Sequence, residues 1–349
     1  MTRLLCDVDT GIDDACALTY LLGKRVVDSG LELAGISTSA GNTTARQAAV
    51  NTLAVLDSCG ATDVEVTIGS EQPLQLELVT TPETHGMAGL GYAQVPDLSA
   101  RLSARPHLEM WLEEMRAHPG ETTLLVTGPL TNLTRALREA PEIVDLVGQV
   151  VIMGGCFGGR GGNVTPVAEW NSWVDPHAAK EVFAAFAGRP TDRLPVVAGL
   201  QVTEQVYVRP AELDDLVDAA GGVPPRLSPD ATRNPDRHTD TGRPALDLLV
   251  DALAFYFEFH SDYDEGYFAH LHDLYAAMLA TGDVTASTTA VCVDVEADSE
   301  LTRGQTIADH RGIWGRPPNA RIVTAADRDA VLRRWRESLA ALENRPRRR

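Results

Sequence analysis

Asp7-Val8-Asp9-Thr10-Gly11-Ile12-Asp13-Asp14 follows a short apolar run near the N-terminus, and this stretch decides how the fold is interpreted. Residues 3–8 have the composition of a short buried strand, whereas residues 13–23 carry apolar side chains at helical spacing. A strand that turns directly into a helix is the repeating unit of α/β proteins. The four aspartates therefore lie at the carboxyl end of a strand, where open α/β sheets bind their ligands.

The rest of the chain continues this alternation of strand and helix. Apolar segments bounded by turn residues predict further strands, at residues 31–38, 64–69, 123–127, 149–154 and 195–199. Helical periodicity follows most of them, as at residues 44–58, and predicts an amphipathic last helix at residues 325–343. Repeated units of this kind predict an α/β fold with an open, mainly parallel central sheet and helices on both faces.

A single domain over residues 1–349 accounts for this pattern, because single α/β sheets with insertions reach this size. Residues 219–244 are rich in Gly, Pro and Asp, which is typical of a linker or of an exposed insertion that acts as a lid. We favour the insertion, because candidate site residues lie on both sides of it. Residues 344–349, which end in arginines, are expected to form a disordered tail.

The composition argues against several partners. A formal net charge of −19 repels nucleic acid and anionic membranes, and no stretch approaches the run of about 20 apolar residues that spans a membrane. The five cysteines are odd in number and have no metal-site spacing, so we expect buried thiols in a reducing compartment. No signal peptide is visible, and we therefore expect a cytoplasmic protein.

The cluster Asp7, Asp9, Asp13 and Asp14 places four like charges within eight residues. Such crowding is costly unless a cation or hydrogen-bond donors compensate it, and a hard divalent ion is the simplest compensation. Calcium takes six to eight oxygen ligands at roughly 2.3–2.6 Å. The alternative is a helix N-terminus that favours acidic residues, which accounts for Asp13 and Asp14 but not for the two aspartates on the strand end.

Three further polar groups follow later strands. A strand ends at Thr127, so the Thr127 carbonyl points out of the same edge of the sheet. The glycines of Met153-Gly154-Gly155 allow a ligand to approach the backbone closely. Amide and carboxylate side chains follow at Asn163, Glu169 and Asn171, and they suit either a sugar ligand or an ordinary polar turn. His270-Leu271-His272-Asp273 sets histidine beside a carboxylate, which indicates an acid/base pair, a metal site or a chance neighbourhood on a loop.

Taken together and in this order, these groups resemble the nucleoside hydrolase family of the inosine–uridine type over residues 3 to about 325. The matching motifs are Asp-x-Asp-x-Gly-x-Asp-Asp at 7–14, Gly41-Asn42, His-Gly-x-x-Gly-Leu at 85–90, Thr-Gly-Pro-Leu-Thr-Asn at 127–132, the pattern Asn163, Glu169, Asn171, Asp175-Pro176, and His272-Asp273. Thr10 and Leu274 stand where the family usually has proline. Neither position supplies a reacting side chain, so these departures concern the subgroup and not the chemistry.

The resemblance implies that the chain hydrolyses the N-glycosidic bond of ribonucleosides to ribose and free base. It implies a calcium site formed by Asp9, Asp14, Asp273 and the Thr127 carbonyl. Asp9 would also act as general base on a calcium-bound water, and His272 resembles the leaving-group acid of one subgroup. Asp7 would hold the cluster. The remaining implied residues would hold the ribose or lie near the base, namely Asp13, Asn42, His85, Met153, Asn163, Glu169 and Asn171. The family usually forms homodimers or homotetramers.

Two other functions share part of this pattern. A non-catalytic nucleoside or ribose binding protein would keep the sugar-holding residues but lose the base or the metal ligands, all of which are present here. A haloacid-dehalogenase-like phosphatase also places Asp-x-Asp at a strand end, but it needs a lysine near the phosphate. The only lysines, Lys24 and Lys180, follow no matching motif, and Gly282-Asp283 has no acidic partner close behind. The sequence leaves the base preference open between purine and pyrimidine.

Overall fold

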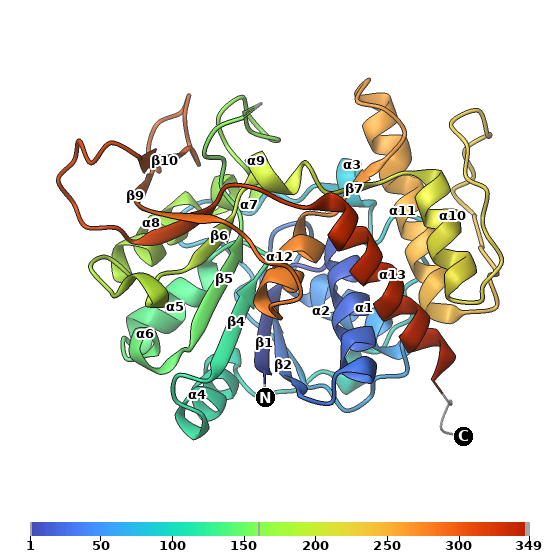
Figure 1. The fold of residues 1–349 in the computed structure, drawn as a ribbon, viewed down its shortest axis with the longest axis horizontal. Helices are drawn as coiled ribbons and strands as arrows, with labels where there is room; N and C mark the ends of the chain where they lie inside the picture. The colour runs from blue at the N-terminus through green and yellow to red at the C-terminus, as the bar shows by residue number, and fades with distance from the viewer. Residues whose placement is uncertain (1, 160, 346–349) are drawn as a thin grey trace.

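The computed structural model describes residues 2–159 and 161–345, and it shows a large sheet between layers of helices (Figure 1). The strands of these residues are β1 (Thr2–Val8), β2 (Leu31–Thr38), β3 (Val66–Ile68), β4 (Thr122–Val126), β5 (Gln149–Met153), β6 (Val196–Ala198), β7 (Tyr207–Val208), β8 (Ala269–His270), β9 (Thr288–Val295), β10 (Thr306–Asp309) and β11 (Ala320–Val323). Within the described residues, nine strands form the main sheet in the order β10-β9-β11-β6-β5-β4-β1-β2-β3, and β7 pairs with β8.

The central strands of the main sheet are parallel. β1 lies between β2 and β4, β5 pairs with β4 and β6, and all of these pairs run in the same direction. Within the described part of this sheet only β9 is reversed: it runs antiparallel to both of its neighbours, β10 and β11, which keep the common direction. The six predicted strands are confirmed with shifts of one or two residues, and the predicted α/β class is confirmed with them.

Helices and two short 3-10 segments connect the strands. They are α1 (Ile12–Val27), α2 (Ala45–Ser58), α3 (Pro82–His85), η1 (Ser99–Arg101), α4 (His107–Ala117), α5 (Thr131–Glu139), α6 (Ile143–Leu146), α7 (Trp170–Val174), α8 (Pro176–Ala185), η2 (Thr191–Arg193), α9 (Leu200–Thr203), α10 (Pro210–Ala219), α11 (Pro244–Asp262), α12 (His272–Ala280) and α13 (Arg328–Asn344). After β1, β4 and β6 the next helix begins within five residues of the strand end, whereas longer loops follow β2, β3 and β5.

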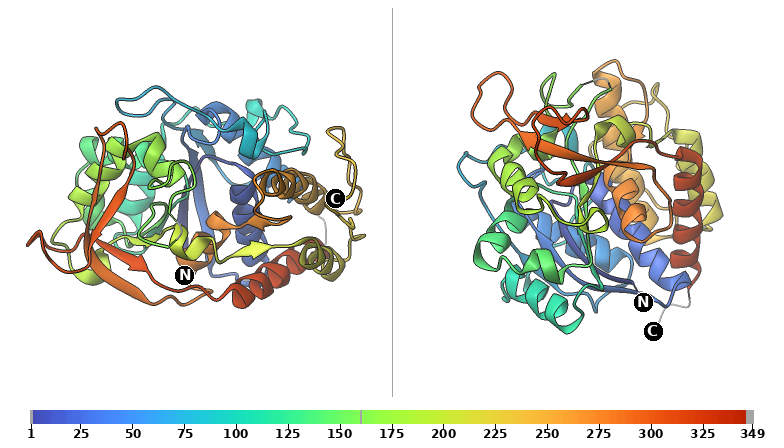
Figure 2. Two further views of the ribbon diagram at one scale, coloured as in Figure 1. Left: turned by 90° about the horizontal axis from the view of Figure 1, so that it is seen from above. Right: turned by 60° about the vertical axis from the view of Figure 1, so that its left-hand side comes forward.

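Two hydrophobic cores cover the two faces of the sheet. Leu4, Cys6 and Val8 of β1 belong to the core with α1, α2, α11 and α13, whereas Leu5 belongs to the core with α4, α5 and α8. Alternate residues of one strand therefore bury against opposite layers, which is why this strand is apolar throughout. The helices of the two layers are seen on opposite sides of the sheet in Figure 2.

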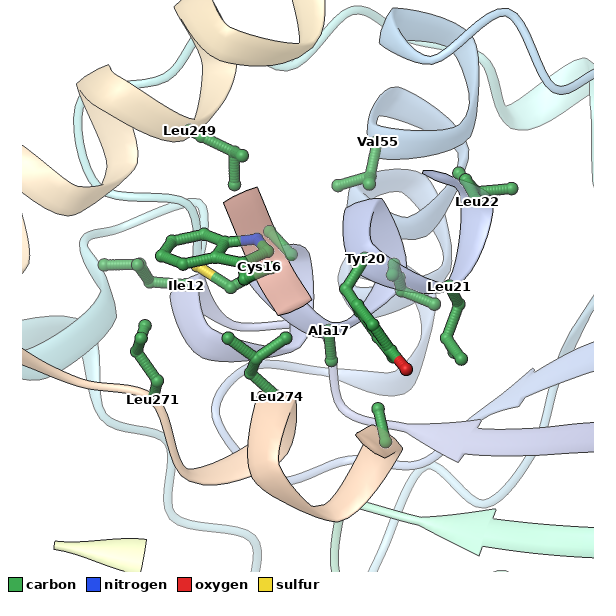
Figure 3. Close-up of a cluster of buried hydrophobic side chains, with 14 of the residues drawn as sticks. Ile12, Cys16, Ala17, Tyr20, Leu21, Leu22, Val55, Leu249, Leu271 and Leu274 are labelled. Atoms are coloured by element: carbon green, nitrogen blue, oxygen red, sulfur yellow. The ribbon is translucent and has the colours of Figure 1, made fainter. Parts of the chain in front are cut away.

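Helix α1 is enclosed by other helices along its first three turns, where every residue from Ile12 to Gly23 is buried. Ile12, Cys16 and Tyr20 point into the core shared with α2, α11 and α12 (Figure 3). At Gly23 a Cβ atom would lie 2.2 Å from the backbone oxygen of Ser338, so only glycine allows α13 to pack this closely. Because the helix is buried from its first turn, the acidic residues of that turn are buried as well.

Residues 220–243 connect α10 to α11 without helix or strand and lie beside these two helices (Figure 1). The segment is fastened to α11, because the backbone N–H of Thr239 donates to Asp251 and that of Thr241 donates to Asp247. Its role as an insertion or lid within a single domain stays a prediction. The expected tail starts later than residue 344, because Asn344 still belongs to α13, and residues 346–349 lie outside the described residues. None of the helices in the described chain is long and apolar enough to cross a membrane.

Candidate active site

Two segments that are distant in sequence, residues 9–14 and the first turn of α12, bring carboxylates together beyond the carboxyl ends of the strands. Asp13 and Asp14 lie in the first turn of α1, Asp273 lies in the first turn of α12, and Asp9 follows β1. Asp13, Asp14 and Asp273 are all buried and offer oxygen atoms within 4.8 Å of one another. The sequence-predicted association of the N-terminal cluster with Asp273 is therefore present in the structure.

Asp9 has one satisfied and one unsatisfied oxygen. Its Oδ2 accepts a hydrogen bond of 2.7 Å from the backbone N–H of Asn42. Among the residues that the structure describes, no group donates to its Oδ1, although the side chain is fully buried. Burying a hydrogen-bond acceptor without a partner costs free energy of folding, so this oxygen of Asp9 is a candidate to contact a ligand bound at the carboxylate cluster.

Asp14 is held in place by two donors. Its Oδ2 accepts from the backbone N–H of Gly11 at 2.8 Å, and its Oδ1 accepts from the Thr127 hydroxyl at 2.7 Å. The turn after β4 therefore contacts the cluster through the hydroxyl of Thr127, whereas the Thr127 carbonyl accepts from the amide of Asn171. Asp7 lies further back, where its Oδ1 accepts from the Ser37 hydroxyl at 2.6 Å and from the Asn132 amide at 2.8 Å. These bonds tie β1 to β2 and α5.

Burial and mutual repulsion shift the acidity of the whole cluster. Burial raises the pKa of Asp7 and of Asp13 to about 7, and the charge of Asp14 adds to the shift of both. Burial also raises the pKa of Asp9 and Asp273 well above the usual range, and the other charges that act on Asp273 are carboxylates. Without positive charge beside it, the cluster therefore holds protons near neutral pH.

Asn171 connects the ends of two strands. Its amide donates to the carbonyl of Thr127 at 2.6 Å and to the carbonyl of Met153 at 3.3 Å. Its own backbone N–H donates to Glu169, whose carboxylate also accepts from the backbone N–H groups of Gly155 and Ser172. Glu169 is thus the N-cap of α7, and its oxygens hold the backbone around the site.

Asn163 and Met153 differ in solvent exposure. Met153 ends β5 and is buried, in contact with Asn171. Asn163 is exposed, and its Oδ1 accepts from the backbone N–H of Trp170 at 2.9 Å, which places it in the loop that leads into α7. The predicted ribose-holding roles of Asn163 and Glu169 stay predictions, since the contacts present are with backbone groups.

Two predicted histidines lie on the other side of the cluster. The Nδ1 of His85 accepts from the backbone N–H of Ile12 at 3.1 Å, so that its proton is on Nε2, and burial lowers its pKa to about 3. The Nδ1 of His272 lies 2.8 Å from the hydroxyl of Thr203, and burial lowers the pKa of His272 well below its usual range. Both imidazoles are therefore neutral at neutral pH.

Further aromatic rings pack beside these histidines; of them, Tyr256 and His260 were not predicted from the sequence, whereas His270 belongs to the predicted group 270–273. His85 lies 5.7 Å from Tyr256 between ring centroids, Tyr256 lies 4.5 Å from His260, and His270 lies 5.1 Å from both His260 and His272. Tyr256 and His260 are one helical turn apart in α11, and that i,i+4 spacing of polar rings within an apolar helix was the available signal.

This geometry agrees with comparisons to known proteins. Residues 4–333 match the family described as inosine-uridine preferring nucleoside hydrolase. The chain belongs to this family. It is accordingly a ribonucleoside hydrolase, an enzyme that cleaves the N-glycosidic bond of ribonucleosides.

Relatives and solved structures cover almost the whole enzyme. A pyrimidine-specific ribonucleoside hydrolase of Salmonella paratyphi C is 31% identical over 330 residues, which are 94% of this chain and 95% of that protein. A plant nucleoside hydrolase structure has a TM-score of 0.81 at 28% identity and covers 97% of this chain and 99% of its own. The structure of a purine-preferring ribonucleoside hydrolase of Gardnerella vaginalis has a TM-score of 0.82 at 25% identity, and the match covers 98% of this chain and 99% of that one.

Gly41 controls the position of Asp9 in this enzyme. A Cβ atom at this position would lie 2.1 Å from Oδ2 of Asp9 and 2.7 Å from the ring of Pro129. We expect Gly41→Ala to displace the Asp9 carboxylate and to lower kcat on a ribonucleoside by about 10²-fold, the usual cost of a misplacement of this size. Gly30→Ala, in a turn where the only near atom belongs to the Asp28 side chain, is the control. An unchanged kcat in Gly41→Ala would mean that the position of Asp9 is not critical.

Proposed function

We propose that Asp9 is the general base that takes a proton from the attacking water, in a site where Asp9, Asp14, Asp273 and the Thr127 carbonyl hold calcium. The observation that carries this proposal is the unpartnered Oδ1 of Asp9 within a buried set of carboxylates from separate segments. A non-catalytic binding site would need the sugar-holding amides but not this crowding of negative charge.

The residues present fit a hard cation. The proposed ligands are carboxylate and carbonyl oxygens, which suit calcium, and buried hydrogen bonds hold two of these ligands, Asp14 and the Thr127 carbonyl. Positive charge at this point would also remove the repulsion that raises the pKa of Asp9 and Asp273. When bound, calcium supplies Lewis acidity and positive charge that make a nearby water easier to deprotonate.

The protein groups around the cluster suit the sugar. Cleavage passes through an oxocarbenium-like state, so the enzyme must hold the ribose hydroxyls and stabilise a growing positive charge. Asp13 and the amides of Asn42 and Asn171 lie around the cluster and are the proposed partners of the hydroxyls. Buried carboxylates fixed before the reaction stabilise the developing cation without reorganisation. Asp9 keeps one oxygen bound to the Asn42 N–H and leaves the other for the water proton.

Release of reducing sugar from a panel of purine and pyrimidine ribonucleosides tests the proposal. We expect ribose release from at least one nucleoside, loss of that release in a chelator, and recovery when calcium is added back. Release that persists in the chelator would contradict the calcium assignment. Nucleoside binding without ribose release would contradict catalysis. The panel also measures base preference. The similar proteins differ in this property by name, because one is called pyrimidine-specific and another purine-preferring.

Calcium is expected to stabilise the fold, and more strongly as the pH rises. In calcium-free protein the native carboxylates, with pKa values of about 7 for Asp7 and Asp13, hold protons that the unfolded chain loses near its ordinary pKa of 3.8. Their contribution to stability is therefore complete below about pH 4 and is lost as the pH rises through 7. Calcium bound at Asp9, Asp14 and Asp273 would oppose protonation of these ligands and, through its charge, of the neighbouring Asp13. At 100 times its Kd, calcium adds about 2.7 kcal/mol to the free energy of unfolding.

Thermal unfolding with calcium or with chelator, between pH 5.5 and pH 8, measures this effect. The difference in Tm between the two conditions should increase with pH. The buried histidines titrate in both conditions, so their opposite contribution cancels in the difference. A calcium effect that is constant or that shrinks with pH would contradict binding at these carboxylates. We also propose a homodimer or homotetramer in the cytoplasm, for which the mass in solution is the first check.

A further inference from the structure

A second set of metal-ligating side chains lies outside the carboxylate cluster. It consists of His260 in the last turn of α11, Glu265 in the turn that follows, and His270 at the end of β8. Each of the three offers one ligand atom, and these atoms all lie within 4.8 Å of one another. The proposed chemistry of ribose cleavage uses none of the three.

We propose that His260, Glu265 and His270 form a binding site for a borderline divalent ion of the zinc class, separate from the calcium site. Two imidazole nitrogens and one carboxylate oxygen are the donor set that zinc prefers, at about 2.0–2.2 Å, with further positions left for water. Calcium is a poor match, because it requires six to eight oxygen ligands. The two sites would therefore select different metals.

The orientation of His260 supports a role as a ligand. Its side chain is buried, and its Nδ1 lies 2.9 Å from the backbone carbonyl of Tyr256. A carbonyl can only accept, so the proton of His260 is on Nδ1 and the lone pair of Nε2 faces Glu265 at 3.8 Å. Metal-bound histidines usually donate their second N–H to a backbone carbonyl or carboxylate in this way. Burial lowers the pKa of His260, which keeps the imidazole in the neutral form that binds metal.

The turn after α11 is shaped so that Glu265 folds back over His260. The backbone N–H of Glu265 donates to the carbonyl of His260 at 3.0 Å, and Asp264 and Gly266 have φ angles of +57° and +118°. A φ of +118° is accessible essentially to glycine alone, so Gly266 is required for this return of the chain. The Glu265 side chain is 49% exposed, and its rotation can close the distance to the two imidazoles.

An ion pair is the other interpretation of His260 and Glu265, and the structure disfavours it. An ion pair would require a protonated imidazole, whereas burial lowers the pKa of His260 and opposes that charge. A bound cation provides the positive charge beside Glu265 without protonating His260. It would also link α11 to β8, which leads through Leu271 into His272 and Asp273.

Zinc binding to the calcium-saturated enzyme, measured against a chromogenic chelator and without substrate, tests this proposal. We expect one zinc ion per chain. Glu265→Gln and His270→Gln should each weaken its affinity by at least about tenfold, since even groups that only support a ligand cost 10–100-fold. Asp264→Asn, on the same turn and equally tolerant of a positive φ, is the matched control and should bind zinc as the unaltered enzyme does.

A second measurement identifies the donors. Copper(II) bound in place of zinc should show hyperfine coupling to two imidazole nitrogens in its electron paramagnetic resonance spectrum, and to one in His270→Gln. Glu265 lies on an exposed turn, so the melting temperature of Glu265→Gln without zinc should match that of the unaltered enzyme. The proposal would be overturned by absence of zinc binding, by displacement of zinc by excess calcium, or by a zinc affinity in both variants equal to that of the unaltered enzyme. Because no substrate is present, failure here leaves the hydrolytic function untouched.

Discussion

Asp9→Ala is expected to lower kcat/KM for ribonucleoside hydrolysis by about 10²–10⁴-fold from the loss of a general base alone. The loss of a proposed calcium ligand adds to that factor. The structure explains why no neighbour can substitute for Asp9. Asp14 has both oxygens engaged by Gly11 and Thr127, and Asp7 lies behind the cluster with Ser37 and Asn132. Asp9 combines a fixed oxygen, bonded to the N–H of Asn42, with an unpartnered one. Asp7 also has an unpartnered oxygen, but it lies further back, bonded to Ser37 and Asn132.

The fold of Asp9→Ala should survive, because the substitution removes a buried charge that is itself repelled by Asp14. Steady-state kinetics on the best nucleoside, together with circular dichroism and Tm, separate catalysis from folding. Asp283→Asn is the control, since it also alters a partly buried aspartate, but one that pairs with Lys24 and Tyr20 at the opposite end of α12. Near-normal hydrolysis by Asp9→Ala would remove Asp9 from the role of base.

The sequence predicts well which strand ends and helix starts form this site, because these are encoded in local sequence patterns. The run from Asp7 to Asp14 shows a strand end and a helix start within eight residues, and parallel strands necessarily present their carboxyl ends at one edge. Thr127 ends another strand of that edge, one position along the sheet. The meeting of Asp273 with this cluster has no local signal, and it was predicted only through the resemblance to a family.

Other parts of the site depend on contacts that no local pattern encodes. Tyr256 and His260 belong to a helix whose apolar period predicts only core packing, and they reach the site because α11 packs against α3 and β8. Glu169 has contacts that its pattern did not predict: a carboxylate between two asparagines suggests a sugar ligand, and the structure shows that it also accepts from three backbone N–H groups. Its role toward the ribose stays a prediction. The reversal of β9 escaped prediction because it depends on pairing with β10 and β11, which lie later in the chain, and not on the composition of β9.

His272→Ala tests how the base departs. If His272 donates a proton to the leaving base, we expect hydrolysis of ordinary nucleosides to fall by about 10²–10⁴-fold, and hydrolysis of an activated aryl riboside to change little, because its leaving group needs no proton. Burial lowers the pKa of His272 well below its usual range, so at neutral pH the donor is the neutral imidazole and its tautomer matters. Equal losses on both substrates would exclude proton donation and leave a structural role.

Thr203 supplies the matched variant for this test. Its hydroxyl lies 2.8 Å from Nδ1 of His272, and a hydroxyl that donates to Nδ1 places the proton on Nε2, where it can reach a leaving group. Thr203→Val keeps the shape of this buried side chain but removes the donor. We expect a smaller loss than in His272→Ala with the same dependence on the leaving group, because Thr203 acts by positioning His272. A loss in Thr203→Val that is equal for nucleosides and aryl ribosides would show instead that the hydroxyl supports only the local packing of α9 against α12.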